Sequence, residues 1–286
     1  MRTIRTVAEL REALLPHRKA GRSIGLVPTM GAFHEGHLAL MRRAREDTAV
    51  VVVSLFVNPP QVRPSEDLAA YPRDEAADAA QAEAIGVDVL FAPPAAEVYP
   101  PGFSTEVRVG GVTEPLEGAA RGSEHFHGVT TVVAKLFNMV APDVAYFGQK
   151  DAQQVAVIQQ LVRDLDIPVR IQVCPTVREP DGLAMSSRNR YLEPAHRDRA
   201  VGLSRALRAA EDAARGGERD AAAIVSAARA ALVESGIEPE YLELVSTETL
   251  APVDRVGDTD VLVAVAARVG PARLIDNIII HANGRQ

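Results

Sequence analysis

The stretch that decides the fold is Ile24-Gly25-Leu26-Val27-Pro28-Thr29-Met30-Gly31-Ala32-Phe33-His34-Glu35-Gly36-His37-Leu38-Ala39-Leu40-Met41. Its first four residues are a short apolar run, long enough for one buried strand. Pro28, Gly31 and Gly36 then interrupt the regular pattern, as a strand-to-helix turn does. From His37 onward, apolar residues recur at the spacing of one helix face. The stretch therefore predicts a strand, a turn and a helix in succession.

His34 and His37 flank the predicted start of this helix. The first N–H groups of a helix have no partner within it, and the helix dipole is positive there, so a helix start favours phosphate. Gly36 lacks a Cβ and lets a ligand approach the backbone closely. The spacing of the histidines predicts imidazoles on the same side of the helix. The turn is thus a candidate phosphate site; the alternative is two histidines in a surface loop.

Composition narrows the class of protein. The chain has 286 residues, is 47% hydrophobic and 24% charged, which is typical of a globular protein. A net charge of −7 argues against broad nucleic-acid binding. The single cysteine, Cys174, excludes an intramolecular disulfide, suits a reducing compartment and is predicted to be a small buried side chain. Without a long apolar run or a signal peptide, we expect a cytoplasmic enzyme.

Strand and helix patterns alternate up to about residue 176. Predicted helices cover 7–17, 74–85, 128–140 and 151–165, and further predicted strands cover 49–57, 87–92, 144–147 and 169–173. This alternation predicts an α/β domain with a Rossmann-like, doubly wound parallel sheet over residues 1–176. Ligands of such sheets bind beyond the carboxyl ends of the strands.

The pattern changes in residues 177–286. Two alanine-rich helices are predicted at 195–215 and 220–234, followed by strands at 241–245, 261–267 and 273–279 with no helix between them. Helices followed by successive strands predict a smaller α+β domain with an antiparallel sheet.

A family resemblance begins at the opening stretch. Residues 27–37 resemble the signature of the pantothenate synthetases, or pantoate–β-alanine ligases, which belong to an adenylyl-transferring group with a His-Ile-Gly-His-type motif. The resemblance implies catalytic roles for His34 and His37 and pantoate contacts for Pro28 and Met30. It also implies an ATP-binding turn made of Met30, Gly31, Ala32, Phe33, His34, Glu35, Gly36 and His37.

Two polar stretches follow other predicted strand ends. Asn58 and Gln61 are amides, which suit a ligand bearing hydroxyls and a carboxylate. The resemblance assigns Gln61 to pantoate and both amides to β-alanine. In the second stretch, Lys150 supplies a point charge for phosphate. There the resemblance implies pantoate binding by Gln154 and ATP binding by Gly148, Gln149, Lys150 and Asp151.

A third candidate is the stretch from Met185 to Arg188. Serine hydroxyls beside a guanidinium make a phosphate clamp. The stretch is similar to the family's Met-Ser-Ser-Arg loop, which implies triphosphate contacts for Ser186, Ser187 and Arg188, with Val177 and Met185 near the adenine. The alternative is a helix-capping loop. Lys150 and Arg188 join the two histidines as predicted catalytic residues.

Three further signals are less specific. The segment from Arg121 to His125 resembles a family motif but has one extra residue and lacks its proline. Tyr71 lies in a Tyr-Pro-Arg sequence that resembles a family motif near the amine, which implies β-alanine binding. Asp78 is a candidate for indirect contact with Mg²⁺, which usually binds ATP phosphates with few protein carboxylates; a solvated helix face explains it equally well. We expect no structural metal site.

The resemblance implies an AMP-forming ligase that joins pantoate to β-alanine through a pantoyl adenylate, with ATP and Mg²⁺, as a homodimer. Three alternatives stay open: a nucleotidyltransferase with the same motif, an aminoacyl-tRNA synthetase-like protein, and a nucleotide sensor without catalysis. Because an adenylate is labile in water, we also expect loop closure by the segment from Val62 to Leu68 or by the loop at Arg121.

Overall fold

The computed structural model describes residues 1–61, 74–122 and 124–282. The chain divides into two compact units. Unit 1 comprises Met1–Gly110, Arg121–Gly148 and Val157–Pro175, and unit 2 comprises Gly111–Ala120, Gln149–Ala156 and Thr176–Gln286. Before residue 176 the chain therefore enters unit 2 twice, through two short segments that the sequence analysis assigned to the first domain.

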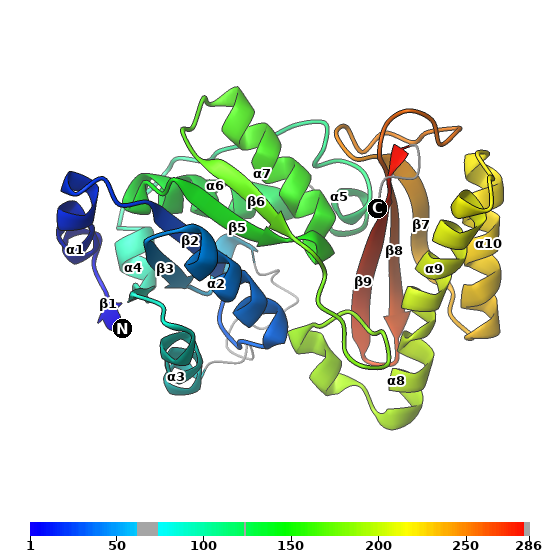
Figure 1. Cartoon of the computed structure of the whole chain (residues 1–286), viewed down its shortest axis with the longest axis horizontal. Coiled ribbons are helices and arrows are strands. Elements are labelled where there is room, and N and C mark those ends of the chain that lie inside the picture. Colours follow the sequence, from blue (N-terminus) through cyan, green and yellow to red (C-terminus); the bar gives the residue numbers. More distant parts are fainter. Residues whose placement is uncertain (62–73, 123, 283–286) are drawn as a thin grey trace. The chain divides into compact units, whose positions relative to one another are not determined.

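Unit 1 is built on a parallel sheet, as the sequence predicts (Figure 1). Among the described residues the sheet has six strands in the order β1-β4-β3-β2-β5-β6. The strands are β1 (Arg2–Ile4), β2 (Ile24–Thr29), β3 (Val50–Leu55), β4 (Val89–Phe91), β5 (Val144–Gly148) and β6 (Arg170–Cys174). The predicted Rossmann-like class of this domain is confirmed.

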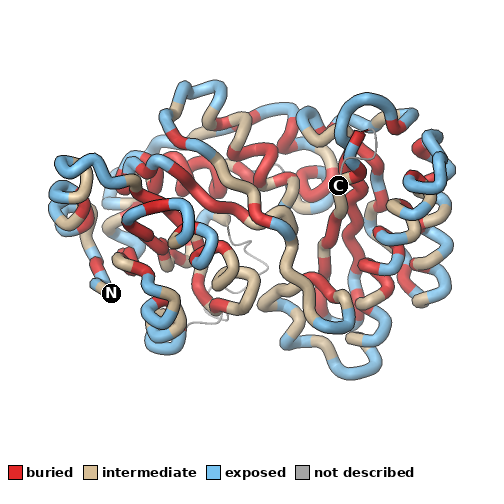
Figure 2. Tube along the Cα trace, in the orientation of Figure 1, coloured by how far each residue is buried: buried red, intermediate tan, exposed pale blue. Residues whose placement is uncertain are grey.

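Helices cover the sheet and explain the nearly continuous apolar strands. The first seven α-helices are α1 (Val7–Lys19), α2 (Glu35–Asp47), α3 (Glu75–Ile85), α4 (Ala95–Val98), α5 (Glu117–Arg121), α6 (Glu124–Val140) and α7 (Ala152–Asp164). Helix α2 packs on β2, β3 and β5 and against α3, while α1 packs against α6. Val27 and Val53 join the core cluster under α2, and Leu26 and Val52, which alternate with them, are also fully buried. Figure 2 shows this burial along the strands, as expected for a sheet covered on both faces.

The strand order puts a topological switch point beside β2. From β2 the chain proceeds to β3 and β4 on one side, and later to β5 and β6 on the other. The sheet order therefore reverses between β2 and β5, which pair with each other at the centre of the sheet. Ligands of doubly wound sheets bind at such switch points, beyond the carboxyl ends of the strands. The histidine turn follows directly from β2.

Unit 2 contains a three-stranded antiparallel sheet within the described residues, with the order β7-β8-β9. Its strands are β7 (Pro239–Ser246), β8 (Val261–Val269) and β9 (Ala272–Ile280), and its main helices are α8 (Pro194–Ala200), α9 (Gly202–Arg215) and α10 (Ala221–Glu234). Leu203 and Leu207 of α9 share a core cluster with Ile224 of α10 and Val263 of β8. This core confirms the predicted α+β arrangement.

Two local features differ from the sequence analysis. No element was predicted before the helix at 7–17, but Arg2–Ile4 forms β1 by pairing with β4; three residues are too few to leave a periodic signal. The helix predicted at 195–215 is two helices separated by Val201. A Cβ on Gly202 would lie 2.5 Å from Cβ of Ser235, so the second helix begins at a residue where only glycine fits. Within the part of the chain that the structure describes, no helix has the length and apolar character needed to cross a membrane.

Candidate active site

The turn after β2 is held by a buried carboxylate. Asp78 of α3 is 3% exposed, and its two oxygens accept the backbone N–H groups of Ala32 at 2.8 Å and Phe33 at 2.7 Å. Gly31 has φ +87°, and a Cβ there would lie 3.0 Å from Asp78 Oδ2. Ala32 also has a positive φ of 54°. Charge-assisted hydrogen bonds of this kind hold a turn that local conformational preference opposes.

This contact changes the interpretation of Asp78. The sequence suggested an indirect partner for Mg²⁺ or a solvated helix face. Instead, the side chain is buried and both oxygens are hydrogen-bonded to the turn. The structure therefore makes Asp78 an anchor of the histidine turn, which periodicity in α3 alone does not reveal.

The two imidazoles cap the first turn of α2. His34 is the N-cap residue, and its Nδ1 accepts the backbone N–H of Gly36 at 3.1 Å. The backbone N–H of His34 in turn donates to Nδ1 of His37 at 3.4 Å. Because each Nδ1 is an acceptor, the hydrogen-bond pattern assigns the proton of each neutral ring to Nε2. The ring centroids are 4.2 Å apart, so the two imidazoles lie side by side at the helix start.

The amides after β3 have different surroundings. Asn58 is 1% exposed; its Nδ2 donates to the carbonyl of Gly128 at 3.0 Å, and its Oδ1 accepts from the hydroxyl of Tyr99 at 2.6 Å. Burial raises the pKa of Tyr99 to about 12, so the hydroxyl stays a donor at neutral pH. Asn58 therefore joins the loop after β3 to α6. This structural contact was not part of its predicted β-alanine role.

Gln61 is partly exposed and ends a short 3-10 helix, η1 (Pro59–Gln61). Nδ1 of His125, near the start of α6, lies 3.1 Å from the backbone carbonyl oxygen of Gln61. A Cβ on Gly128 would lie 2.8 to 2.9 Å from the backbone of Pro60 and Gln61, so this glycine permits close packing of α6 on η1. The fold thus brings His125, from the imperfect family motif, next to Gln61.

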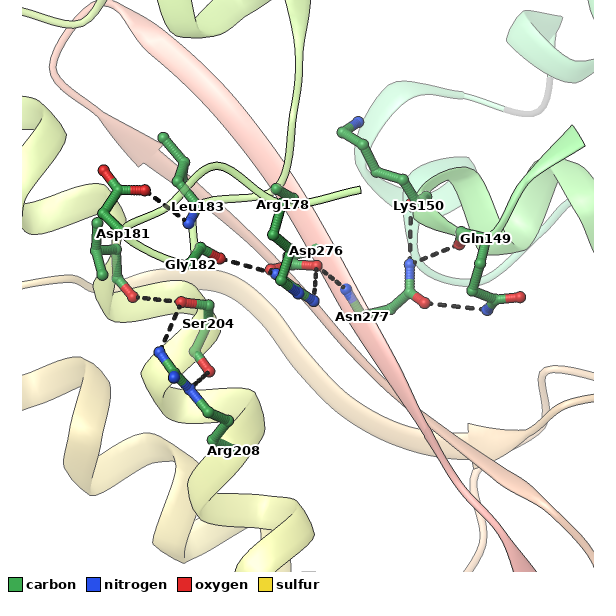
Figure 3. A network of polar contacts seen from close by, with 12 residues as sticks. Gln149, Lys150, Arg178, Asp181, Gly182, Leu183, Ser204, Arg208, Asp276 and Asn277 are labelled. Carbon is green, nitrogen blue, oxygen red and sulfur yellow. Dashed lines mark hydrogen bonds and ion pairs between the residues drawn. The ribbon is translucent and has the colours of Figure 1, made fainter. Parts of the chain in front are cut away.

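In unit 2, the predicted lysine lies in a 3-10 turn, η2 (Gln149–Asp151), at the start of α7. Nζ of Lys150 is 3.6 Å from Oδ1 of Asp151, and the two side chains are 17% and 50% exposed. The turn is held from β9: the side-chain amide of Asn277 donates to the carbonyls of Gln149 at 3.0 Å and Lys150 at 2.9 Å. Figure 3 shows these contacts.

The glutamines that follow differ in burial. Gln153 is 5% exposed; its Oε1 accepts the N–H of Glu117 at 2.9 Å, and its Nε2 donates to the carbonyls of Val112 and Pro115. It therefore fastens the 111–120 segment to α7. Gln154 is the partly exposed member of the pair, and its contact with pantoate stays a prediction.

The residues assigned to adenine lie on one hairpin of unit 2, and those assigned to the triphosphate follow it directly. The backbone N–H of Met185 donates to the carbonyl of Val177 at 2.9 Å, and Arg178 forms a bridge with Ala184. Next in the chain, Ser186 caps the 3-10 helix η3 (Ser187–Tyr191), with its Oγ 3.2 Å from the backbone N of Arg188. Arg188 is exposed. The fold thus places Val177 beside Met185, and the Ser-Ser-Arg clamp directly after them.

The comparisons with known proteins identify the family of the chain. A family model described as pantoate-beta-alanine ligase matches residues 2–279. The chain belongs to this family. Membership makes it a ligase that joins pantoate to β-alanine, and favours that function over the alternatives that the sequence left open.

Individual relatives span the whole chain. It is 53% identical over 283 residues to a pantothenate synthetase of Roseiflexus castenholzii, covering 99% of this chain and 100% of the relative. It is 54% identical over 280 residues to pantothenate synthetase 1 of Bradyrhizobium diazoefficiens, covering 98% of each chain.

Solved structures extend the similarity to the fold. The crystal structure of pantothenate synthetase from Thermus thermophilus matches with a TM-score of 0.91 and 49% identity, covering 98% of this chain and 100% of that chain. The pantoate-beta-alanine ligase from Francisella tularensis, complexed with beta-gamma ATP and beta-alanine, matches with a TM-score of 0.80 and 32% identity, covering 98% and 97%.

Some predicted site residues of this ligase lie outside the described residues. These are Tyr71 and the segment from Val62 to Leu68. Among the residues that the structure does describe, no group of three His, Cys, Asp or Glu side chains is arranged to hold a metal ion.

Sequence reasoning missed the polar residues of β9. Arg273 donates to both carboxylate oxygens of Glu117 at 2.8 Å, and Tyr241 donates to the same carboxylate at 2.9 Å. Asp276 and Asn277 are buried in the same strand. The sequence does contain a sign of this role: Asp276 and Asn277 interrupt an isoleucine-rich run. Because buried polar groups are nearly always hydrogen-bonded, polar residues in such a run are expected to hold partners.

Proposed function

We propose that the chain condenses pantoate with β-alanine in two half-reactions. In the first, a carboxylate oxygen of pantoate attacks the α-phosphorus of ATP, the bond from that phosphorus to the β-phosphate oxygen breaks, and pyrophosphate leaves. In the second, the β-alanine amine attacks the acyl carbon of pantoyl adenylate, loses a proton, and AMP leaves. Adenylation is needed because oxide is too poor a leaving group for direct amide formation.

No covalent enzyme intermediate is required by this scheme. The protein must align the reactants and stabilise charge on the phosphoryl oxygens. The proposed catalytic residues are His34, His37, Lys150 and Arg188: the imidazoles donate through Nε2–H, and the two cations act as counter-charges. The wider ATP-binding set comprises Met30, Gly31, Ala32, Phe33, Glu35, Gly36, Gly148, Gln149, Asp151, Val177, Met185, Ser186 and Ser187.

The observation that supports the proposal best is the cap of α2. Both Nδ1 atoms accept backbone N–H groups, which assigns the remaining ring protons of His34 and His37 to adjacent Nε2 atoms. Two such donors at a helix start, after the strand at the switch point, suit an anionic phosphoryl group. The two donors are already held in place by the backbone, so little reorganisation is needed when charge develops.

The proposed acyl and amine sites use polar side chains. Gln61, Gln154, Pro28 and Met30 would contact pantoate. Gln61 and Tyr71 would contact β-alanine. Because Asn58 is buried and bonded to Gly128 and Tyr99, its proposed contribution to β-alanine binding is to hold the loop that carries Gln61.

Mg²⁺ is the proposed metal, bound through the phosphates of ATP, where it would neutralise charge. The oxygens of Asp78 already accept two backbone N–H groups, so we do not assign that carboxylate to the metal. We further propose a homodimer, which light scattering tests, and a cytoplasmic location, since a chain with one cysteine suits a reducing compartment.

The test is stepwise addition of substrates to the purified chain with Mg²⁺. ATP alone should release nothing, ATP with pantoate should release pyrophosphate, and AMP should appear in stoichiometric amounts after β-alanine is added. AMP formation that needs β-alanine but no prior pyrophosphate release would contradict the adenylate pathway. A stable adenylylated product that forms without any amine would support a nucleotidyltransferase instead.

A further inference from the structure

Two adjacent buried polar residues lie in the middle of β9. Asp276 is 3% exposed and Asn277 is 5% exposed. Neighbouring residues of a strand point to opposite faces of the sheet, and these two have different partners, as Figure 3 shows. The proposed mechanism assigns no role to either side chain. Because a buried polar group without hydrogen-bond partners is destabilising, the partners of each side chain indicate its role.

Asn277 holds the lysine turn. Its Nδ2 donates to the carbonyls of Gln149 at 3.0 Å and Lys150 at 2.9 Å, and its Oδ1 accepts from Nε2 of Gln149 at 3.0 Å. All three bonds end on the two residues that precede Asp151 in η2. They fix the backbone from which the Lys150 side chain extends, although Asn277 is 127 positions away in the chain.

Asp276 holds the hairpin that carries the residues assigned to adenine and leads to those assigned to the triphosphate. Arg178 donates to both of its oxygens, at 2.6 and 3.0 Å, and also to the carbonyl of Gly182 at 3.2 Å. The Arg178 side chain is 31% exposed, whereas that of Asp276 is 3% exposed. Arg178 follows Val177 directly and bridges to Ala184, the residue before Met185.

The same carboxylate links the two contacts. Oδ1 of Asp276 accepts the backbone N–H of Asn277 at 2.8 Å. A rotation of the Asp276 side chain would break this bond as well as the pair with Arg178. Both residues lie on a strand that pairs with β8 along its length. The two residues therefore fix the lysine turn and the 177–185 hairpin to the same strand.

We propose that Asp276 and Asn277 are positioning residues for the adenylation step. Asn277 orients Lys150, and Asp276, through Arg178, orients the hairpin that leads to Ser186, Ser187 and Arg188. This inference rests on the proposed function of Lys150 and Arg188. It predicts that the pair acts on the rate of pyrophosphate release through those cations and not merely on folding.

The first experiment is a double-mutant cycle on Asn277. Asn277→Asp has the same shape but lacks the two N–H donors, and Asn277→Ala removes the contacts without adding charge. With ATP and pantoate, each variant should lower kcat for pyrophosphate release about 10- to 100-fold, with a smaller change in the KM for ATP, because misplacement by about 1 Å is enough to slow the step. In a Lys150→Ala background, single-turnover rates with and without the Asn277 change should agree within about twofold, since Asn277 acts through Lys150.

The second arm tests Asp276 in the same way. Asp276→Asn keeps the size of the side chain but removes the charge that pairs with Arg178. It should lower the same rate, and its effect should largely disappear in an Arg188→Ala background.

A stability control separates positioning from folding. Val263→Ala truncates a fully buried residue of β8 in the same unit and makes no polar contact with either turn. It should lower the melting temperature while leaving kcat within about twofold of wild type. Melting curves of all variants show whether a rate loss exceeds the loss of folded protein.

The outcomes are distinct. Rate losses that vanish in the Lys150→Ala and Arg188→Ala backgrounds support the proposal. Equal fold-losses in both backgrounds, or a kcat within twofold of wild type for folded Asn277 variants, overturn it while leaving the proposed function intact. A wild-type chain that releases no pyrophosphate from ATP and pantoate overturns the adenylate mechanism, and this inference with it.

Discussion

The two imidazoles of unit 1 and the lysine turn of unit 2 are oriented in different ways. Each ring, of His34 and of His37, accepts a backbone N–H group from a residue two or three positions away. The lysine turn is held by Asn277, more than 120 positions further along the chain. A local cap is encoded in a motif and can form as soon as the helix does, whereas the lysine turn depends on a completed sheet. Residues with similar proposed tasks can therefore differ in whether a local sequence motif reveals how they are held.

The largest effect is expected from a variant that separates the two roles of His34, as the N-cap of α2 and as a proposed donor to phosphate. His34→Asn keeps an N-cap acceptor but removes the imidazole, so the free energy of unfolding should change by less than about 0.5 kcal/mol. Because the Nε2–H donor is lost, kcat for pyrophosphate release should fall about 10²- to 10³-fold. Denaturant melts and a pyrophosphate assay measure the two effects.

His34→Ala is the matched variant for this test. It removes both the cap and the donor, and should cost about 1 kcal/mol of stability in addition to the same loss of rate. Pyrophosphate release at the wild-type rate by His34→Asn would show that the imidazole serves only as a cap.

Next in size is the non-local anchor of the histidine turn. Asp78→Asn leaves at least one of the N–H groups of Ala32 and Phe33 without a good acceptor, and should lower the free energy of unfolding by about 1–3 kcal/mol. The Mg²⁺ concentration that gives half-maximal pyrophosphate release should not change. Chemical denaturation and a Mg²⁺ titration check both expectations.

Asp74→Asn is the control on the same helix. Asp74 caps α3 through the N–H of Ala77 at 3.0 Å, and asparagine caps equally well, so stability should stay near wild type. A raised Mg²⁺ requirement for Asp78→Asn with unchanged stability would instead identify Asp78 as a metal partner.

A smaller effect is expected in the hairpin of unit 2. Gly182 has φ +96°, and a Cβ there would lie 3.1 Å from a guanidinium nitrogen of Arg208. Gly182→Ala should therefore lower the free energy of unfolding by about 1–2 kcal/mol. Since this residue turns the strand pair that carries Val177 and Met185, the KM for ATP should also rise.

Gly217→Ala is the corresponding control, because Gly217 has a similar φ of +100° but open space around its Cα. It should lose stability without a change in the KM for ATP. Equal changes in KM for both variants would mean that the hairpin does not set nucleotide affinity.

The smallest effect concerns Cys174, which is 6% exposed. Burial raises the pKa of the Cys174 thiol, so less of it is thiolate at a given pH than for a free cysteine. Iodoacetamide at about pH 8.5, near the pKa of a free thiol, should leave the native chain unlabelled and fully active, and should label it after unfolding. Mass spectrometry measures the labelled fraction; rapid labelling of the native chain would contradict the assignment.

Much of the fold could be predicted because burial imposes short-range patterns. The apolar run that forms β3, the helix that follows His34 and the successive strands after residue 239 all have a periodicity that the chain shows directly. The short strand β1 could not be predicted this way, because it forms only by pairing with β4.

The site residues also differ in whether local sequence or distant partners determine their surroundings. Residues placed by turns directly after strands, such as His34 and Lys150, were accessible to motif reasoning. Asn58 was identified as polar and near a ligand, but its bonds to Tyr99 and Gly128 span 41 and 70 positions. Nothing in the spacing of an isolated asparagine distinguishes a ligand from such a clamp.

The amino-acid sequence by itself therefore determined the α/β and α+β classes of the two domains, the helix start at His34 and the family to which the chain belongs. These features depend on interactions within a few residues, or on motifs that are contiguous. Folding in three dimensions decided that Asp78 anchors the histidine turn and that Asn277 holds the lysine turn. Those bonds join residues 46 and 127–128 positions apart, and only the strand order and the packing of helices on the sheets bring such partners within hydrogen-bonding distance.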